Sequence, residues 1–170
     1  SGILFLLLSA CQQNEKPQVQ SVEVVYSHQE IQQNEQDARA LIAQYNLWEL
    51  DSSPMLQAYR GLKTHYSEWD DISESAQEKQ HEKNAEFLQA AQKINLSAID
   101  QDLALSIKVL SYLLKQNHQL YPYRHHNYPV NQLFGWHTQI PTFLVNIHQI
   151  QTIKDAKDYV KRIRAVRPLM

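Results

Sequence analysis

The chain has 170 residues, 43% of them hydrophobic and only 3 of them glycine, so it is long enough and apolar enough to bury one core. Its 16 basic and 18 acidic residues give a net charge of -2, which argues against nucleic-acid binding because phosphate contacts need a basic face. The single cysteine excludes an internal disulfide framework and cannot by itself form a Cys-rich zinc site.

The N-terminus has the pattern of a bacterial lipoprotein signal peptide. An apolar run over residues 3–8 is far too short to cross a bilayer, which takes about 20 residues. The run ends in Leu8-Ser9-Ala10-Cys11, which matches the lipobox L-[AS]-[AG]-C. We therefore expect residues 1–10 to be the remnant of a signal peptide, and Cys11 to carry diacylglycerol and an acyl chain such as palmitate.

The residues after Cys11 support this reading over a buried or chance cysteine. They form a polar segment with Pro17, which is unlike the surroundings of a core cysteine. Gln12, and not Asp, follows the cysteine, and by resemblance to Gram-negative lipoproteins this favours the periplasmic face of the outer membrane. Residues 11–32 are accordingly predicted to be a lipid-anchored tether.

Helical spacing of apolar residues begins after the tether and predicts an amphipathic helix over residues 33–50. Ser53 is expected to cap a short helix with Pro54 at its first position, and Gly61 to end it in a left-handed conformation. A longer helix is predicted over residues 73–94, after the capping-box pattern that begins at Asp71.

The next predicted helix begins with Ser97-Ala98-Ile99-Asp100, has about 24 residues, and is the best candidate for the centre of the core. Its apolar stripe consists of six residues at helical spacing: Leu103, Ile107, Leu110, Leu113, Leu114 and Leu120. Residues 121–141 are rich in aromatic and histidine residues, but proline and glycine interrupt the helical spacing there. We therefore expect an ordered loop that packs on other protein.

Helical spacing returns over residues 142–150, and Thr152 is predicted to cap a last helix over residues 156–166, beyond which Pro168 bars continuation. The basic run Lys154 to Arg167 alternates with apolar residues, so it is interpreted as the solvated face of that helix in preference to an anionic-ligand patch. The predicted fold class is all-α: an irregular bundle of about five helices with a long aromatic-rich loop.

The eight histidines do not form a recognisable metal site, and no catalytic set is predicted. His81-Glu82 begins like the zinc helix H-E-x-x-H, but Ala85 stands where the second histidine is needed. His125 and His126 are adjacent and would point away from each other on any regular element. No G-x-S-x-G elbow or glycine-rich phosphate loop occurs, and pairs of carboxylates such as Asp70 and Asp71 are explained by capping and solvation.

One stretch could line a substrate cleft. Asn131 and Gln132 stand among aromatic residues that include Trp136, and their amides could bind a peptide backbone. The alternative, which we favour on the sequence, is a crossover between helices whose amides satisfy buried backbone groups.

Several segments together resemble a known family. They are the Ser53-Pro54 helix start, the Tyr66 to Asp71 turn, the P-x-N-Q-x-x-G piece over residues 129–135, and the D-Y-x-x-R piece over residues 158–162. In this combination, from about Leu41 to Met170, the chain resembles the N-terminal part of the bacterial domain-of-unknown-function family 885, whose members are large, mostly helical and often lipoproteins. The family carries an H-E-x-x-P-G-H-H zinc helix, similar to that of gluzincin metallopeptidases, in a later part of the polypeptide, and nothing here matches that helix.

The resemblance implies that residues 33–170 are the N-terminal helical domain, truncated at its C-terminus, of a longer zinc-peptidase-like lipoprotein. This segment would contribute scaffold and cleft wall, with no cofactor of its own, while zinc would belong to the full-length protein. Its partners would be the membrane through the lipid anchor, the remainder of the polypeptide and a peptide substrate, but not nucleic acid. The alternative is a stand-alone envelope lipoprotein that acts as a helical binding module.

Overall fold

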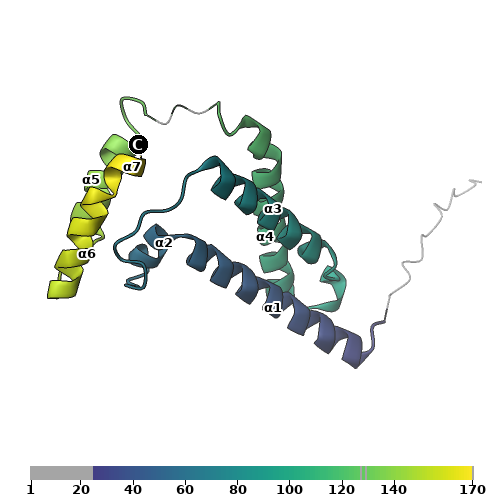
Figure 1. Ribbon diagram of the computed structural model, residues 1–170. Helices are drawn as coiled ribbons and strands as arrows, with labels where there is room; N and C mark the ends of the chain where they lie inside the picture. The colour runs from purple at the N-terminus through teal and green to yellow at the C-terminus, as the bar shows by residue number, and fades with distance from the viewer. Residues whose placement is uncertain (1–24, 127, 129, 170) are drawn as a thin grey trace, which may run out of the picture.

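The computed structural model describes residues 25–126, 128 and 130–169, and within these ranges the secondary structure is helical apart from one isolated bridge between Val130 and Gly135. The predicted all-α fold class is confirmed. The elements, shown in Figure 1, are α1 (His28–Ser52), α2 (Pro54–Tyr59), α3 (Glu74–Gln92), the 3-10 turn η1 (Leu96–Ala98), α4 (Gln101–Leu120), the 3-10 turn η2 (Tyr121–Tyr123), α5 (Trp136–Asn146), α6 (Ile153–Arg164) and α7 (Val166–Leu169). The lipobox and Cys11 lie outside the described residues.

The first of two apolar cores lies between α1, α3 and α4. Eight buried side chains form it: Ala38 and Leu41 from α1, Phe87 and Ala91 from α3, and Leu103, Ile107, Leu110 and Leu114 from α4. Tyr45 and Trp48 pack around Phe87 with ring centroids 5.4 Å away. As predicted, α4 is central to this core, because it contributes half of its buried residues.

The second core joins α2, the segment between α2 and α3, and α5. Its buried members are Ala58, Tyr66, Trp69, Ile140 and Phe143, with Ala165 and Val166 at its edge. Figure 1 shows α5, α6 and α7 side by side, apart from the α1–α3–α4 group and linked to it by the long connection after η2. The segment over residues 60–73 therefore belongs to the second core, although in the sequence it lies between α1 and α3, which belong to the first core.

Helix starts and stops follow local capping signals, and most of the predicted ones are present. Ser53 caps α2 by accepting from the Leu56 amide at 3.0 Å, and Thr152 and Asp155 form a capping box at α6. Gly61, with φ of 76°, ends the α2 turn in the left-handed conformation. One cap was missed: Ser27 and Glu30 form a capping box, so α1 starts at His28, five residues before the predicted start, and takes in the end of the predicted tether.

Two predicted boundaries near proline are wrong. The helix predicted over residues 142–150 is α5, which begins at Trp136 and runs through Pro141. Proline removes one helical hydrogen bond, but Ile140 and Phe143 on either side are buried in the second core, and this packing keeps the helix continuous. The last helix, predicted over residues 156–166, is α6, which spans Ile153–Arg164. Pro168 was expected to bar further helix, but it lies within the short helix α7.

The predicted apolar stripe of α4 is only partly buried. Leu103, Ile107, Leu110 and Leu114 lie in the core, whereas Leu113 and Leu120 are exposed to 50% and 60%. Leu113 belongs to a second apolar stripe on the outer face of α4.

Candidate functional site

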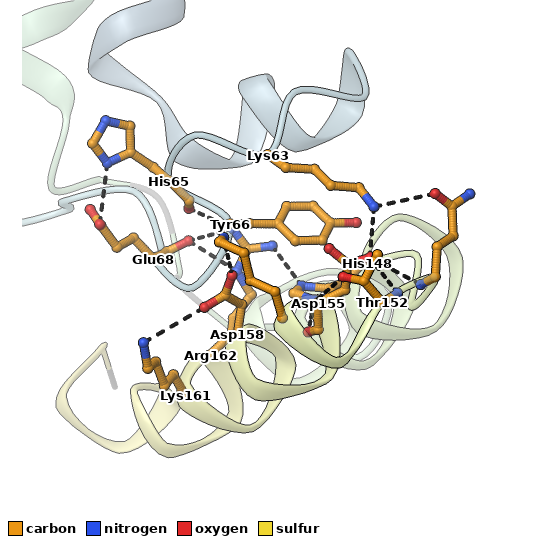
Figure 2. Close-up of polar contacts among 12 residues, drawn as sticks. Lys63, His65, Tyr66, Glu68, His148, Thr152, Asp155, Asp158, Lys161 and Arg162 are labelled. Carbon is orange, nitrogen blue, oxygen red and sulfur yellow. Dashed lines mark hydrogen bonds and ion pairs between the residues drawn. The ribbon is translucent and has the colours of Figure 1, made fainter.

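The densest polar cluster among the described residues attaches α6 to the segment over residues 63–70, and Arg162 is at its centre (Figure 2). Its side chain is fully buried. The guanidinium donates to the Glu68 carbonyl from Nε at 3.0 Å and from Nη2 at 2.7 Å, and to the His65 carbonyl at 3.3 Å. The interpretation of the whole basic run as a solvated face is therefore wrong at Arg162, although Lys154 and Lys161 are exposed.

Aromatic rings enclose the Arg162 guanidinium. Its central carbon lies 4.8 Å from the ring centroid of Phe143 and 5.4 Å from those of Tyr66 and Trp69. These rings attract a cation through their faces, but they also remove it from water. Burial lowers the pKa of Arg162 to about 10, so the side chain stays charged at neutral pH.

His148 is the second buried member of the cluster. Its Nδ1 lies 3.1 Å from Arg162 Nη1, which can only donate, so Nδ1 is an acceptor and the ring proton is on Nε2. Nε2 donates to the Asp155 carbonyl at 3.1 Å, and the ring stacks on Tyr66 with centroids 3.9 Å apart. Burial, followed by the charge of Arg162, lowers the pKa of His148, so this imidazole is neutral.

Asp155 connects the start of α6 to Lys63. Its carboxylate accepts from Lys63 Nζ at 2.8 Å and from the Gln151 and Thr152 amides at 3.0 and 2.9 Å. These donors, and Lys63 above all, hold the pKa of Asp155 well below its ordinary value. Asp158, one turn further along α6, is held ionised in the same way by Lys154 at 2.7 Å.

The polar atoms of this cluster are paired with one another, which makes it a structural clamp between α6 and the segment over residues 63–70. His148 has both nitrogens engaged, and Arg162 uses its donors on backbone carbonyls and on that imidazole. The clamp also accounts for the D-Y-x-x-R piece: Asp158, Tyr159 and Arg162 lie on the inner side of α6, and Tyr159 meets His148 edge-on at 5.1 Å.

Sequence reasoning missed the clamp, although a signal was present. Asp155, Asp158 and Arg162 recur at three- and four-residue spacing and so share one helix face, which is the face that the structure buries. The carboxylate pair Asp70 and Asp71, by contrast, has the capping role expected of it. Asp70 accepts from the Met55 amide at 2.8 Å, and Asp71 from the Ser73 amide at 2.9 Å.

The three predicted cleft-lining residues lie in the connection before α5 and at its start. Asn131 and Gln132 are exposed, and Trp136 is half-buried against the second core. Asn131 Oδ1 accepts from the backbone amides of Leu133 and Phe134 at 2.9 and 2.8 Å, which closes a tight turn. The Asn131 oxygen is thus used within its own loop, while the Gln132 side chain extends from the same turn into solvent.

Among the other described histidines, His81 lies within α3, His118 near the end of α4, and His125 after η2. His81 stacks between His118 and Tyr121, with centroids 4.7 and 3.8 Å away, and His125 lies 3.5 Å from Glu74. Open depressions of about 420 and 240 Å³ flank Tyr121. Over the described part of the chain, no three or more His, Cys, Asp or Glu residues are placed so that they could hold a metal ion.

The described helices include none with the length and apolar character needed to cross a membrane. Residues 54–170 match a family model described as "Bacterial protein of unknown function (DUF885)". A search of curated proteins and a search of solved structures each found no significant match.

Proposed function

Because the chain belongs to the DUF885 family, we propose that it is the helical N-terminal scaffold of a lipid-anchored, zinc-peptidase-like protein and supplies no catalytic residue itself. The peptidase part of this proposal comes from the family resemblance, since the zinc-binding helix lies later in such polypeptides. The role of the present residues would be to pack against that later part and to form one wall of the substrate cleft.

The observation that supports a wall is an ordered turn with apolar side chains exposed at its tip. Leu133 and Phe134 are both 68% exposed, although Asn131 fixes the turn that carries them. Exposing apolar side chains on a fixed turn is unfavourable unless another surface covers them. A cleft that receives a peptide, or an adjoining domain, would provide such a surface.

The test compares this chain with the product of the complete reading frame. We expect the complete product to bind zinc at one equivalent and to cleave peptides, and the 170-residue chain to do neither. Replacing Phe134 by Asp in the complete product should raise KM for peptide more than it changes kcat, because the wall contacts substrate and not the reacting bond. Tight one-to-one zinc binding by the 170-residue chain would contradict the proposal.

The lipid anchor has its own test. We propose that Cys11 is acylated and holds the protein at the periplasmic face of the outer membrane. Metabolic labelling with palmitate should mark the wild-type precursor in cells, and Cys11→Ser should abolish the label and release the protein from the membrane fraction. Label that persists in Cys11→Ser would exclude this site.

The second candidate function is a stand-alone helical binding module. It is favoured by the apolar outer face of α4, which a separate protein could cover as well as a later domain. The reading frame distinguishes the two: a stop codon directly after Met170 favours the binding module, and several hundred further codons that include an H-E-x-x-x-x-H-H helix favour the scaffold.

A further inference from the structure

An apolar groove of about 410 Å³ lies between α1 and α4, and α3 contributes none of its lining residues. Ile42, Tyr45 and Asn46 form its α1 wall, and its α4 wall is formed by Leu105, Ser106, Val109, Leu110 and Leu113. None of these lining residues is charged, and none belongs to the clamp around Arg162. The groove is therefore a separate feature of the first core.

The α4 wall continues onto a second apolar stripe. Leu105, Val109, Tyr112 and Leu113 follow the spacing i, i+4, i+7, i+8 and are 50–62% exposed. This spacing is that of a helix with another helix packed on it. Since Leu103, Ile107, Leu110 and Leu114 already fill the inner face, α4 is apolar on two opposite sides.

The charges beside this stripe are mainly positive. Lys108 and Lys115, both exposed, lie four residues before and three residues after Tyr112, so they border the stripe on α4. Asp102, exposed in the first turn of α4, lies three residues before Leu105 at the N-terminal end of the stripe, and the sequence contains no further Asp or Glu until Asp155. On α1, Arg39 is exposed one turn before Ile42, whereas Glu49 is engaged by the Tyr45 hydroxyl at 3.4 Å.

We infer that the groove between α1 and α4 is the docking site for an amphipathic helix whose apolar stripe is bordered by acidic residues. Its source is a later helix of the longer polypeptide, so this inference rests on the function proposed above. The docked helix would place its apolar side chains over Val109 and Leu113 and its carboxylates beside Lys108 and Lys115. It would add a fourth helix to the α1–α3–α4 group.

Two other occupants fit less well. A bilayer surface would meet a convex apolar face, whereas this face is concave and includes the polar side chains of Asn46 and Ser106. A second copy of the chain, paired through antiparallel α4 helices, would bring the Lys108 and Lys115 borders of both copies together, which is unfavourable.

The first experiment tests whether the groove of the 170-residue chain binds an amphipathic helix with an acidic border. The probe is a synthetic helical peptide of about 20 residues, equivalent to about 30 Å of helix, with a leucine stripe bordered by glutamate. The matched probes have lysine at the border, or the same composition with the stripe scrambled. Fluorescence anisotropy should give saturable binding of the glutamate peptide only.

The variants locate the binding. Val109→Asp should weaken binding of the glutamate peptide about tenfold or more, because it buries a charge at the centre of the contact. Val145→Asp changes an exposed valine of α5 outside the groove and should leave binding unchanged. The double variant Lys108→Glu, Lys115→Glu should shift the preference toward the lysine-bordered peptide.

The second experiment tests the source of the helix, in a Cys11→Ser background. A maleimide should label Val109→Cys rapidly in the 170-residue chain and slowly in the complete product, while Gln89→Cys on exposed α3 should be labelled rapidly in both. Rapid labelling of Val109→Cys in the complete product would overturn the inference. Three other results would also overturn it. One is equal binding of the glutamate peptide by Val109→Asp and the unsubstituted chain. The others are a dimer of the chain that Val109→Asp dissociates, and binding of the chain to anionic vesicles but not to the peptide. Zinc content and peptidase activity report separately on the proposed function.

Discussion

Arg162 performs a task that regular secondary structure performs elsewhere in the chain. The segment over residues 63–70 is not helical, so few of its carbonyls have backbone donors, and one guanidinium donates to the carbonyls of His65 and Glu68. The His65 carbonyl also accepts from the Glu68 amide at 3.1 Å. A planar group with five donors can do this while lying among three aromatic rings, whereas a lysine ammonium has neither the reach nor the geometry. The identity of residue 162 therefore matters more than its charge.

We predict that Arg162→Leu lowers the free energy of unfolding by about 3 kcal/mol, because it leaves the Glu68 carbonyl and the buried His148 Nδ1 without donors and removes one of the two donors to the His65 carbonyl. Arg162→Lys should recover less than half of this loss. Urea denaturation followed by circular dichroism measures both, with Arg164→Leu, an exposed position on the same helix, as the control. Equal effects at residues 162 and 164 would show that the buried hydrogen bonds contribute nothing.

His148 gives the molecule a specific pH dependence. Its pKa in the folded protein is below the ordinary value of 6.5, so the unfolded chain takes up the proton first as the pH falls. The stabilisation by the neutral imidazole is complete above pH 6.5 and is lost as the pH falls from there toward the lowered pKa. Asp155 adds a separate loss only below its ordinary value of 3.8, because its pKa is also lowered.

The expected result is a decrease in stability between pH 7 and pH 5 in wild-type protein. The decrease should be smaller in His148→Gln, which cannot titrate, and unchanged in His137→Gln, where the histidine is exposed. Thermal unfolding at fixed ionic strength measures this. A decrease that is identical in all three proteins would assign the pH dependence to other groups.

At the scale of single elements, the sequence predicts what depends on neighbours in the chain. Ser53, Gly61 and Thr152 act at the predicted positions because capping involves residues three or four apart. Arg162 was not predictable in this way, since its partners His65 and Glu68 are more than 90 residues distant. The start of α5 was missed for a related reason: packing of Ile140 and Phe143 on a distant segment outweighs the local effect of Pro141.

Pro141 and Pro54 offer a direct comparison at this scale. Pro54 occupies the first turn of α2, where its missing N–H is not needed, while Pro141 lies inside α5. We predict that Pro141→Ala, at an exposed position, raises the free energy of unfolding by about 1 kcal/mol by restoring a helical hydrogen bond. Pro54→Ala should be neutral or slightly destabilising. Chemical denaturation of both variants decides the matter, and a loss of stability in Pro141→Ala would show that a bend at this proline is needed for packing.

At the scale of the whole molecule, the chain forms two apolar cores, and the segments that build them alternate along the sequence. The first is built from α1, α3 and α4. The second takes α2 and residues 60–73, which lie between α1 and α3 in the sequence, and is completed by α5. The second core is joined through the clamp by contacts that span more than 90 residues, whereas the first packs helices that lie closer together in the sequence. The two should therefore differ in their resistance to local unfolding.

Phe143 and Phe87 allow this difference to be measured, because each is a buried phenylalanine at the centre of one core. We predict that Phe143→Ala, which costs about 3 kcal/mol, accelerates amide hydrogen exchange in α5 and α6 while α3 and α4 keep their protection. Phe87→Ala should expose α3 and α4 and also weaken the second core, because the segment over residues 60–73 extends from α3. Equal acceleration over all helices in Phe143→Ala would mean that the two cores unfold as one unit.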